Sequence, residues 1–197
     1  MRLLMIVMLA VPALTTIVDR IAITVGNKVI TDSEIDQRIR LTAFESGDKP
    51  DFSLAARKAA ADRLIDQKLV EREMEVGHYP RLKAETTATD AAARDHALAQ
   101  YGLTPADLEA DLARQADLLS FLNLRFRPSV QVSDQDVRQY FDQHVSAKEQ
   151  GQVTLNDVRT QIEQRIAGER ADAEMETWLK DRRKNTRIVY LEKDLAP

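Results

Sequence analysis

One stretch constrains the fold more than any other: residues 60–77, AADRLIDQKLVEREMEVG. Its apolar residues recur at spacings of three, four and seven, which predicts one face of an amphipathic helix: Ala61, Leu64, Ile65, Leu69 and Val76. Gly77 follows as the expected left-handed residue that ends the helix. A lone helix of this kind is only marginally stable in water, so its apolar face must pack against other elements.

The composition favours a helical protein and argues against some kinds of partner. Hydrophobic residues make up 44% of the 197-residue chain but aromatic residues only 5%, which predicts helices packed through aliphatic side chains. The net charge is −4 and no basic block occurs, so a nucleic-acid partner is not expected. Cysteine is absent, which excludes disulfides, thiol catalysis and cysteine metal sites.

Residues 1–13, MRLLMIVMLAVPA, predict a secretory signal peptide. Arg2 supplies the positive charge, an apolar run follows, and Ala13 marks the expected cleavage site. The run is shorter than the roughly 20 residues that a membrane-spanning helix needs, so stable membrane insertion is not expected. The alternative is an uncleaved anchor.

The two ends of the mature chain are predicted to meet in one small sheet. Residues 19–31 have the alternating pattern of a β-hairpin, with a two-residue turn at Gly26 and Asn27. Residues 187–191, RIVYL, supply the other strand. An isolated hairpin is marginal, so this third strand or a helix should cover it. The turn predicts one shared inward face: Ile21, Ile23, Val25 and Ile30.

The rest of the chain is predicted to be helical, which gives a mainly α fold. A capping box at 31–34 begins a helix to about residue 44, and another helix begins near Ser53. Further helices are expected over 81–101, over 105–127, from 133 and from 155. The predicted organisation is a signal peptide followed by a single domain at 14–197, with its first part at 18–144 and its closing helix and strand at 154–191.

The helix at 105–127 has more large apolar residues than one buried stripe requires. Its predicted buried stripe is Leu108, Leu112, Leu119, Leu122 and Phe126. Leu118 and Phe121 lie at the margin of that stripe and are expected to face solvent or a ligand. Such stripes can all be core, or they can leave a groove open to an extended polypeptide. The sequence alone leaves both interpretations open.

No catalytic or metal-binding pattern is present. His78, His96 and His144 are far apart and lack metal-ligand spacing, and no phosphate loop or nucleophile motif occurs. The abundant carboxylates are predicted to lie on the solvated faces of the helices. We therefore expect no catalytic residue, no metal and no cofactor.

The segments VDRIAITVGNKVITDSEIDQRI and RLIDQKLVEREMEVG resemble the N-terminal region of the SurA family of periplasmic chaperones. The matching residues are Val18, Asp19, Ile21, Val25, Ile30, Ser33, Glu34, Leu64, Ile65, Asp66, Leu69 and Gly77. Met74 departs from the pattern, since the family usually has a small residue there. Residues 154–191 are similar to the closing helix and strand of the family.

The resemblance implies a helical chaperone core that binds unfolded outer-membrane proteins in the periplasm. The family normally has one or two parvulin-type prolyl isomerase domains between the short helix and the closing helix. Here only residues 145–153 lie between them, whereas a domain needs at least about 50 residues. The implied protein is a holdase rather than an enzyme, and its client-binding candidates are Leu118, Phe121, Leu122, Phe126, Tyr140 and Phe141.

Two other functions stay open from the sequence. One is an envelope scaffold or assembly protein with a single dedicated partner. The other is a prolyl isomerase by family name only. If the closing strand paired with the hairpin of a second copy, the protein would form a swapped homodimer.

Overall fold

The computed structural model describes residues 19–81, 91–144 and 153–197. Within these ranges the chain is mainly α, with a small antiparallel sheet, as the sequence predicts. The predicted signal peptide and its cleavage site lie outside the described residues. The elements are β1 Ile21–Val25, β2 Lys28–Thr31, α1 Asp32–Ser46, α2 Leu54–Val76, α3 Ala91–Gln100, α4 Pro105–Arg125, η1 Arg127–Ser129, α5 Asp134–His144, α6 Leu155–Asn185, β3 Ile188–Tyr190 and η2 Lys193–Leu195.

The sheet joins the two ends of the described chain, and its strand order is β2-β1-β3. Ile23 on the central strand lies opposite Ile30 on β2 and Tyr190 on β3, so the predicted pairing is confirmed. The predicted inward face is wrong at Ile21, which is 41% exposed. The register shifts between Ile21 and Ile23, and this bulge brings Ala22 into the core instead.

The helix starts follow the predicted local signals. The Thr31 hydroxyl accepts a hydrogen bond from the backbone N–H of Glu34, while the Glu34 carboxylate accepts from the N–H of Thr31. Capping boxes of the same form open α4 at Thr104 and α6 at Thr154. Each box satisfies backbone donors that the first helical turn leaves without partners.

Helix α2 is the centre of the fold because it contributes to two separate cores. Toward the sheet and α1 it buries one set of residues: Ala60, Ala61, Leu64, Ile65 and Leu69. Toward α4 and α6 it buries Val70 and Met74. The expectation that Val76 shares the apolar face is wrong, since this residue is exposed in the last turn, beyond both clusters.

The end of α2 differs from the prediction in an informative way. Gly77 has a φ of −83°, and the left-handed residue is His78, with a φ of 52°. The Tyr79 N–H then donates to the carbonyl of Met74 at 2.9 Å, which closes the helix. A Cβ on Gly77 would lie 2.5 Å from the Tyr79 ring. Glycine is therefore needed at position 77 for ring packing and not for backbone conformation.

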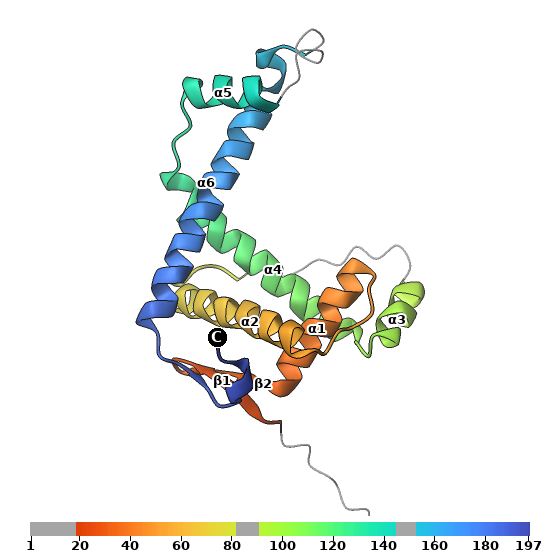
Figure 1. Cartoon of the computed structure of the whole chain (residues 1–197). Helices are drawn as coiled ribbons and strands as arrows, with labels where there is room; N and C mark the ends of the chain where they lie inside the picture. Colours follow the sequence, from red (N-terminus) through yellow and green to blue (C-terminus); the bar gives the residue numbers. More distant parts are fainter. Residues whose placement is uncertain (1–18, 82–90, 145–152) are drawn as a thin grey trace, which may run out of the picture.

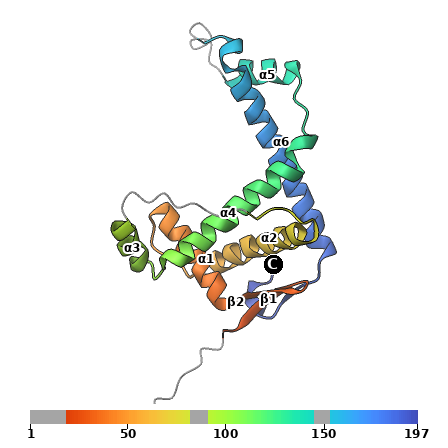
Figure 2. The same cartoon turned by 180° about the vertical axis from the view of Figure 1, so that it is seen from behind.

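Helix α6 gives the molecule its elongated shape (Figures 1 and 2). Its C-terminal half packs on α2 and α4, and its N-terminal half extends away to meet α5 at the opposite end. A small core of its own joins α5 to α6: Val137, Phe141, Ile162 and Ile166. We call this pair of segments the arm.

The helix predicted over residues 81–101 is confirmed only in its second half. Arg81 is not helical, α3 begins at Ala91, and residues 82–90 lie outside the described part of the chain. Gly102 ends α3 in the left-handed conformation, with a φ of 67°. Helix α3 is anchored on α1 through a small cluster: Leu41, Leu98 and Leu103.

Candidate functional site

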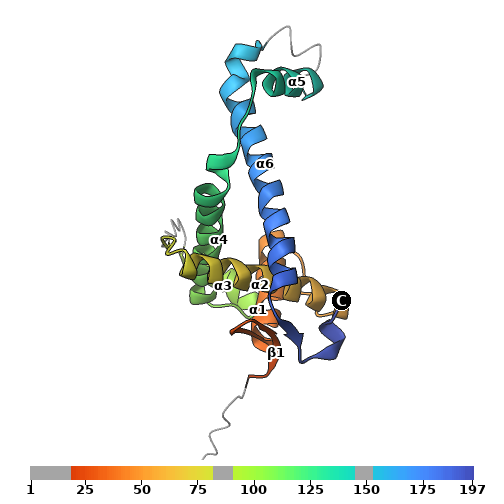
Figure 3. The same cartoon turned by 90° about the vertical axis from the view of Figure 1, so that its left-hand side faces the viewer.

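A cleft of about 330 Å³ lies between α2, α4 and α6. In Figure 3, α4 and α6 rise on either side of α2, which crosses below them. The floor of the cleft is apolar and comes from all three helices: Val70, Met74, Leu118, Met175 and Leu179. Because these residues are distant in sequence, the cleft exists only in the folded protein.

The floor contains both buried and exposed apolar side chains. Met74 and Met175 are buried in the core that joins α2, α4 and α6, while Leu118 is 41% exposed. Methionine is unbranched and polarisable, so it adapts to ligands of different shape. A floor of this kind fits varied apolar side chains better than one fixed ligand.

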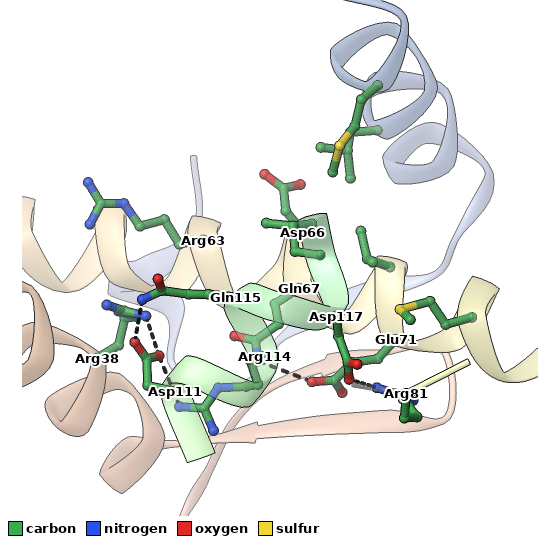
Figure 4. A pocket seen from close by; sticks show the side chains of 15 residues that line it. Arg38, Arg63, Asp66, Gln67, Glu71, Arg81, Asp111, Arg114, Gln115 and Asp117 are labelled. Atoms are coloured by element: carbon green, nitrogen blue, oxygen red, sulfur yellow. Dashed lines mark hydrogen bonds and ion pairs between the residues drawn. The ribbon is translucent and has the colours of Figure 1, made fainter. Parts of the chain in front are cut away.

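Charged and amide side chains line the cleft beside the apolar floor (Figure 4). It contains arginines, acidic residues and glutamines from α1, α2 and α4 and from the segment after α2: Arg38, Arg63, Asp66, Gln67, Glu71, Arg81, Asp111, Arg114, Gln115 and Asp117. We call this set the rim. Both charge signs occur in it, so the rim can pair with backbone and charged groups of a ligand while the floor takes apolar ones.

Asp111 is the most deeply buried member of the rim, with 1% of its surface exposed. Its carboxylate accepts hydrogen bonds from Arg38 Nη1 at 2.7 Å, Arg114 Nη2 at 3.1 Å and Gln115 Nε2 at 2.8 Å. A buried carboxylate is tolerated only when it is paired in this way. This group therefore fixes α4 against α1 at one end of the cleft.

The other end of the cleft is linked to the hairpin by charged side chains. Arg81 Nη1 pairs with Asp117 Oδ2 at 2.9 Å, and the Arg81 guanidinium also lies 3.8 Å from Glu75. Lys28 on β2 donates to Glu75 at 2.7 Å, and this hydrogen bond lowers the pKa of the Glu75 carboxyl. The rim is thus connected to the small sheet through side chains on three segments.

Sequence reasoning missed this site because it assigned every carboxylate to a solvated face. That assignment is wrong for Asp111 and Asp117, which are both buried. A signal was present, since Asp111 lies three residues after Leu108 and seven before Leu118, on one helical face. The partner Arg38 lies 73 positions away, and no local pattern indicates that pairing.

Among the predicted client-binding residues, Leu118 lines the cleft. Phe121 was expected at the margin of the α4 stripe, but it is completely buried. Its ring centroid lies 5.2 Å from Tyr79, 5.3 Å from Trp178 and 5.6 Å from Phe126. Phe126 is buried and Leu122 partly buried in the same cluster.

The remaining two candidates lie in a different part of the molecule. Phe141 is buried in the core of the arm, and Tyr140 is partly buried beside it. The structure therefore does not bring them together with Leu118. The predicted stripe on α4 is also wrong at Leu119, which is 62% exposed. The helix is turned so that Phe121 and Asp111 face the body and Leu119 faces solvent.

A metal cluster and a membrane-spanning helix are both absent from residues 19–81, 91–144 and 153–197. No group of three or more His, Asp or Glu side chains there is arranged to hold a metal ion. In the same ranges, no helix combines the length and apolar character needed to cross a bilayer. His78, His96 and His144 lie in the turn after α2, in α3 and at the end of α5.

No protein-family model matches the chain, and no curated protein matches it in sequence.

Proposed function

We propose that the protein is an exported holdase of the SurA type, which binds unfolded polypeptides in the cleft between α2, α4 and α6. Its clients are outer-membrane proteins in transit through the periplasm, and it acts without a prolyl isomerase domain. The observation that carries the proposal is an apolar floor with an exposed leucine, inside a rim of both charge signs. Such a surface suits an extended chain with apolar side chains and a polar backbone.

The energetics of the cleft fit reversible holding. A volume of about 330 Å³ has room for one or two side chains of a client. Burying one aliphatic side chain contributes about 1.5–3 kcal/mol, from which the ordering of the client must be subtracted. Binding is therefore weak at a single cleft, so clients are released without nucleotide hydrolysis.

The residues that carry the family resemblance have structural roles that support the proposal. The Asp19 carboxylate accepts hydrogen bonds from Ser33 at the start of α1, and these lower the pKa of Asp19. The Asp66 carboxylate of α2 accepts a hydrogen bond from Arg183 of the closing helix at 2.6 Å. The first contact joins the segment before β1 to the start of α1, and the second joins the central helix to the closing helix. Both lie in segments that the resemblance covers.

Leu118→Ser tests the proposal, and Leu119→Ser is its matched control. Leu118 lines the cleft, whereas the neighbouring Leu119 is more exposed and does not. An unfolded β-barrel protein is diluted from urea, and light scattering measures its aggregation with and without each variant. We expect Leu118→Ser to weaken the suppression of aggregation while both variants keep the wild-type melting temperature to within a few degrees. Equal suppression by all three proteins would exclude the cleft as the client site.

The same assay separates a general holdase from a scaffold with one partner. We expect suppression for several unrelated unfolded β-barrel proteins, because the floor is apolar and adaptable. Activity toward one protein alone would favour a dedicated assembly partner. Export is tested separately by N-terminal sequencing of protein from the periplasmic fraction, which should begin near Leu14.

A further inference from the structure

The charges of the rim are unevenly matched, and the imbalance lies at the end where α1, α2 and α4 meet. Three guanidiniums occur there, on Arg38, Arg63 and Arg114. Asp111 accepts from both Arg38 and Arg114, and Glu45 lies 3.4 Å from Arg38. Arg38 and Arg114 therefore have carboxylate partners within the described residues, whereas Arg63 has none.

Arg63 carries most of this imbalance. It is exposed, and its guanidinium donates to the hydroxyl of Thr42 at 3.2 Å. No carboxylate of the described residues lies within ion-pair distance of it. The Nε–H of Arg38 is also buried without an acceptor in the described part of the chain. Donors thus exceed acceptors at this end of the cleft.

The acidic residues elsewhere on the rim are already engaged. Asp66 pairs with Arg183 at 2.6 Å, and Asp117 pairs with Arg81 at 2.9 Å. Glu71 accepts from Gln67 at 3.1 Å. A basic client group would have to compete with these partners. An acidic group instead meets guanidinium N–H groups of Arg38 and Arg63 that are not paired with a carboxylate of the described residues.

We propose that the cleft selects polypeptide segments in which a carboxylate lies one or two residues from an apolar side chain. This inference rests on the proposed function and specifies its client class. The apolar side chain packs on Met74, Leu118 and Met175, and the carboxylate pairs with Arg63 and Arg114. The carboxylate belongs to an aspartate or glutamate side chain or to a free chain end, which have the same chemistry.

Binding of labelled ten-residue peptides to the full chain, measured by fluorescence anisotropy, tests the selection. Each peptide carries two leucines flanked by Glu, Gln or Lys and has an amidated end, and a further Gln peptide has a free carboxyl end. We expect the Glu peptide to bind about two- to fivefold more tightly than the Gln peptide, because one exposed ion pair strengthens binding by about this factor. The Lys peptide should bind most weakly. Tighter binding of the free-ended Gln peptide would show that chain ends are accepted too.

The Arg63→Gln variant should abolish the preference for Glu over Gln. Arg165→Gln removes the same charge from an exposed position on the arm, and this variant should retain the preference for Glu. The preference should also shrink at 1 M salt, where the Debye length falls to about 3 Å. Equal binding of the Glu and Gln peptides by the wild-type protein, or equal loss in both variants, would overturn the inference, as would binding of none of the peptides.

The two proposals fail in different ways. If Leu118→Ser suppresses aggregation as well as the wild type, the cleft is not the client site and both proposals are wrong. If only the Glu preference is missing, the protein still holds clients in the cleft, and their acidic selection alone is excluded.

Discussion

Arg38 of α1 donates from Nη1 to the Asp111 carboxylate of α4 at 2.7 Å, and this contact joins residues 73 positions apart. Asp111 is almost completely buried, and the Arg38 side chain is 14% exposed. A pair of this kind adds little net stability relative to apolar packing, yet each partner is costly to leave alone. The pair therefore sets how α4 lies against α1, which shapes one end of the cleft.

Asp111→Ala should be strongly destabilising, because it leaves Arg38 and Arg114 close together without their shared carboxylate. We expect a loss of about 3–5 kcal/mol in the free energy of unfolding, measured by urea denaturation. Glu176→Ala is the control, since this exposed carboxylate has one distant partner at 3.9 Å. It should change stability by no more than about 0.5 kcal/mol. Similar values for the two variants would contradict the role given to Asp111.

The C-terminal segment should stabilise the fold through one leucine. Leu195 in η2 is buried in the core under the sheet, whereas Leu191, four residues earlier, is 56% exposed. Leu195→Ala should cost about 2–5 kcal/mol, and Leu191→Ala should cost less than about 0.5 kcal/mol. Thermal unfolding followed by circular dichroism compares them. Equal melting temperatures would mean that the C-terminal segment does not stabilise the core.

The sequence predicts the elements of this fold well because their signals are local. Each capping box needs residues only three positions apart, so Thr31, Thr104 and Thr154 mark helix starts without any tertiary information. The hairpin turn likewise sets Ile23 opposite Ile30. The bulge beside Ile21 could not be predicted, because an alternating pattern gives no indication of an inserted residue.

The cleft was harder to predict because it depends on how helices are rotated. The apolar residues of α4 cover more than half of its circumference, so several orientations satisfy the pattern equally well. The buried Asp111 selects one of them through Arg38, which turns Phe121 inward and leaves Leu118 in the cleft. The sequence placed Leu118 outside the buried stripe correctly, but it was wrong for Phe121, which is buried, and for Leu119, which is exposed.

The arm should be sensitive to acid at one carboxylate. Asp136 pairs with Arg170 at 2.7 Å and accepts hydrogen bonds from Ser133, and these interactions hold the pKa of Asp136 far below its usual range. A pKa that is lowered in the folded state stabilises the protein at pH values above the unfolded-state pKa, which is near 4. This stabilisation is lost progressively as the pH falls from there toward the folded-state pKa.

Asp136→Asn should therefore lower the urea midpoint of the protein at neutral pH, and the difference from the wild type should shrink below about pH 4. Asp142→Asn, an exposed change on the same helix, serves as the control and should give a small difference throughout. A difference that grows as the pH falls would reverse the expected sign and exclude this role for Asp136.

Gly77, directly after α2, and Gly168, within α6, should respond in opposite directions to the same substitution. At Gly77 the backbone conformation suits any residue, but an added Cβ would lie 2.5 Å from the Tyr79 ring. That ring packs edge-to-face on Phe121 with a centroid distance of 5.2 Å, inside the core that supports the cleft. In α6, an added Cβ on Gly168 meets no heavy atom within 4 Å.

Gly168→Ala should stabilise the protein by about 0.5–1 kcal/mol, because alanine loses less conformational freedom than glycine in a helix. Gly77→Ala should destabilise it by about 1–3 kcal/mol, because Tyr79 must move from its place against Phe121. Urea denaturation gives both values, and the near-ultraviolet circular dichroism of the aromatic cluster should change only for Gly77→Ala. If both variants were stabilised alike, the helix end would tolerate a side chain and the close approach of Tyr79 would not explain the glycine.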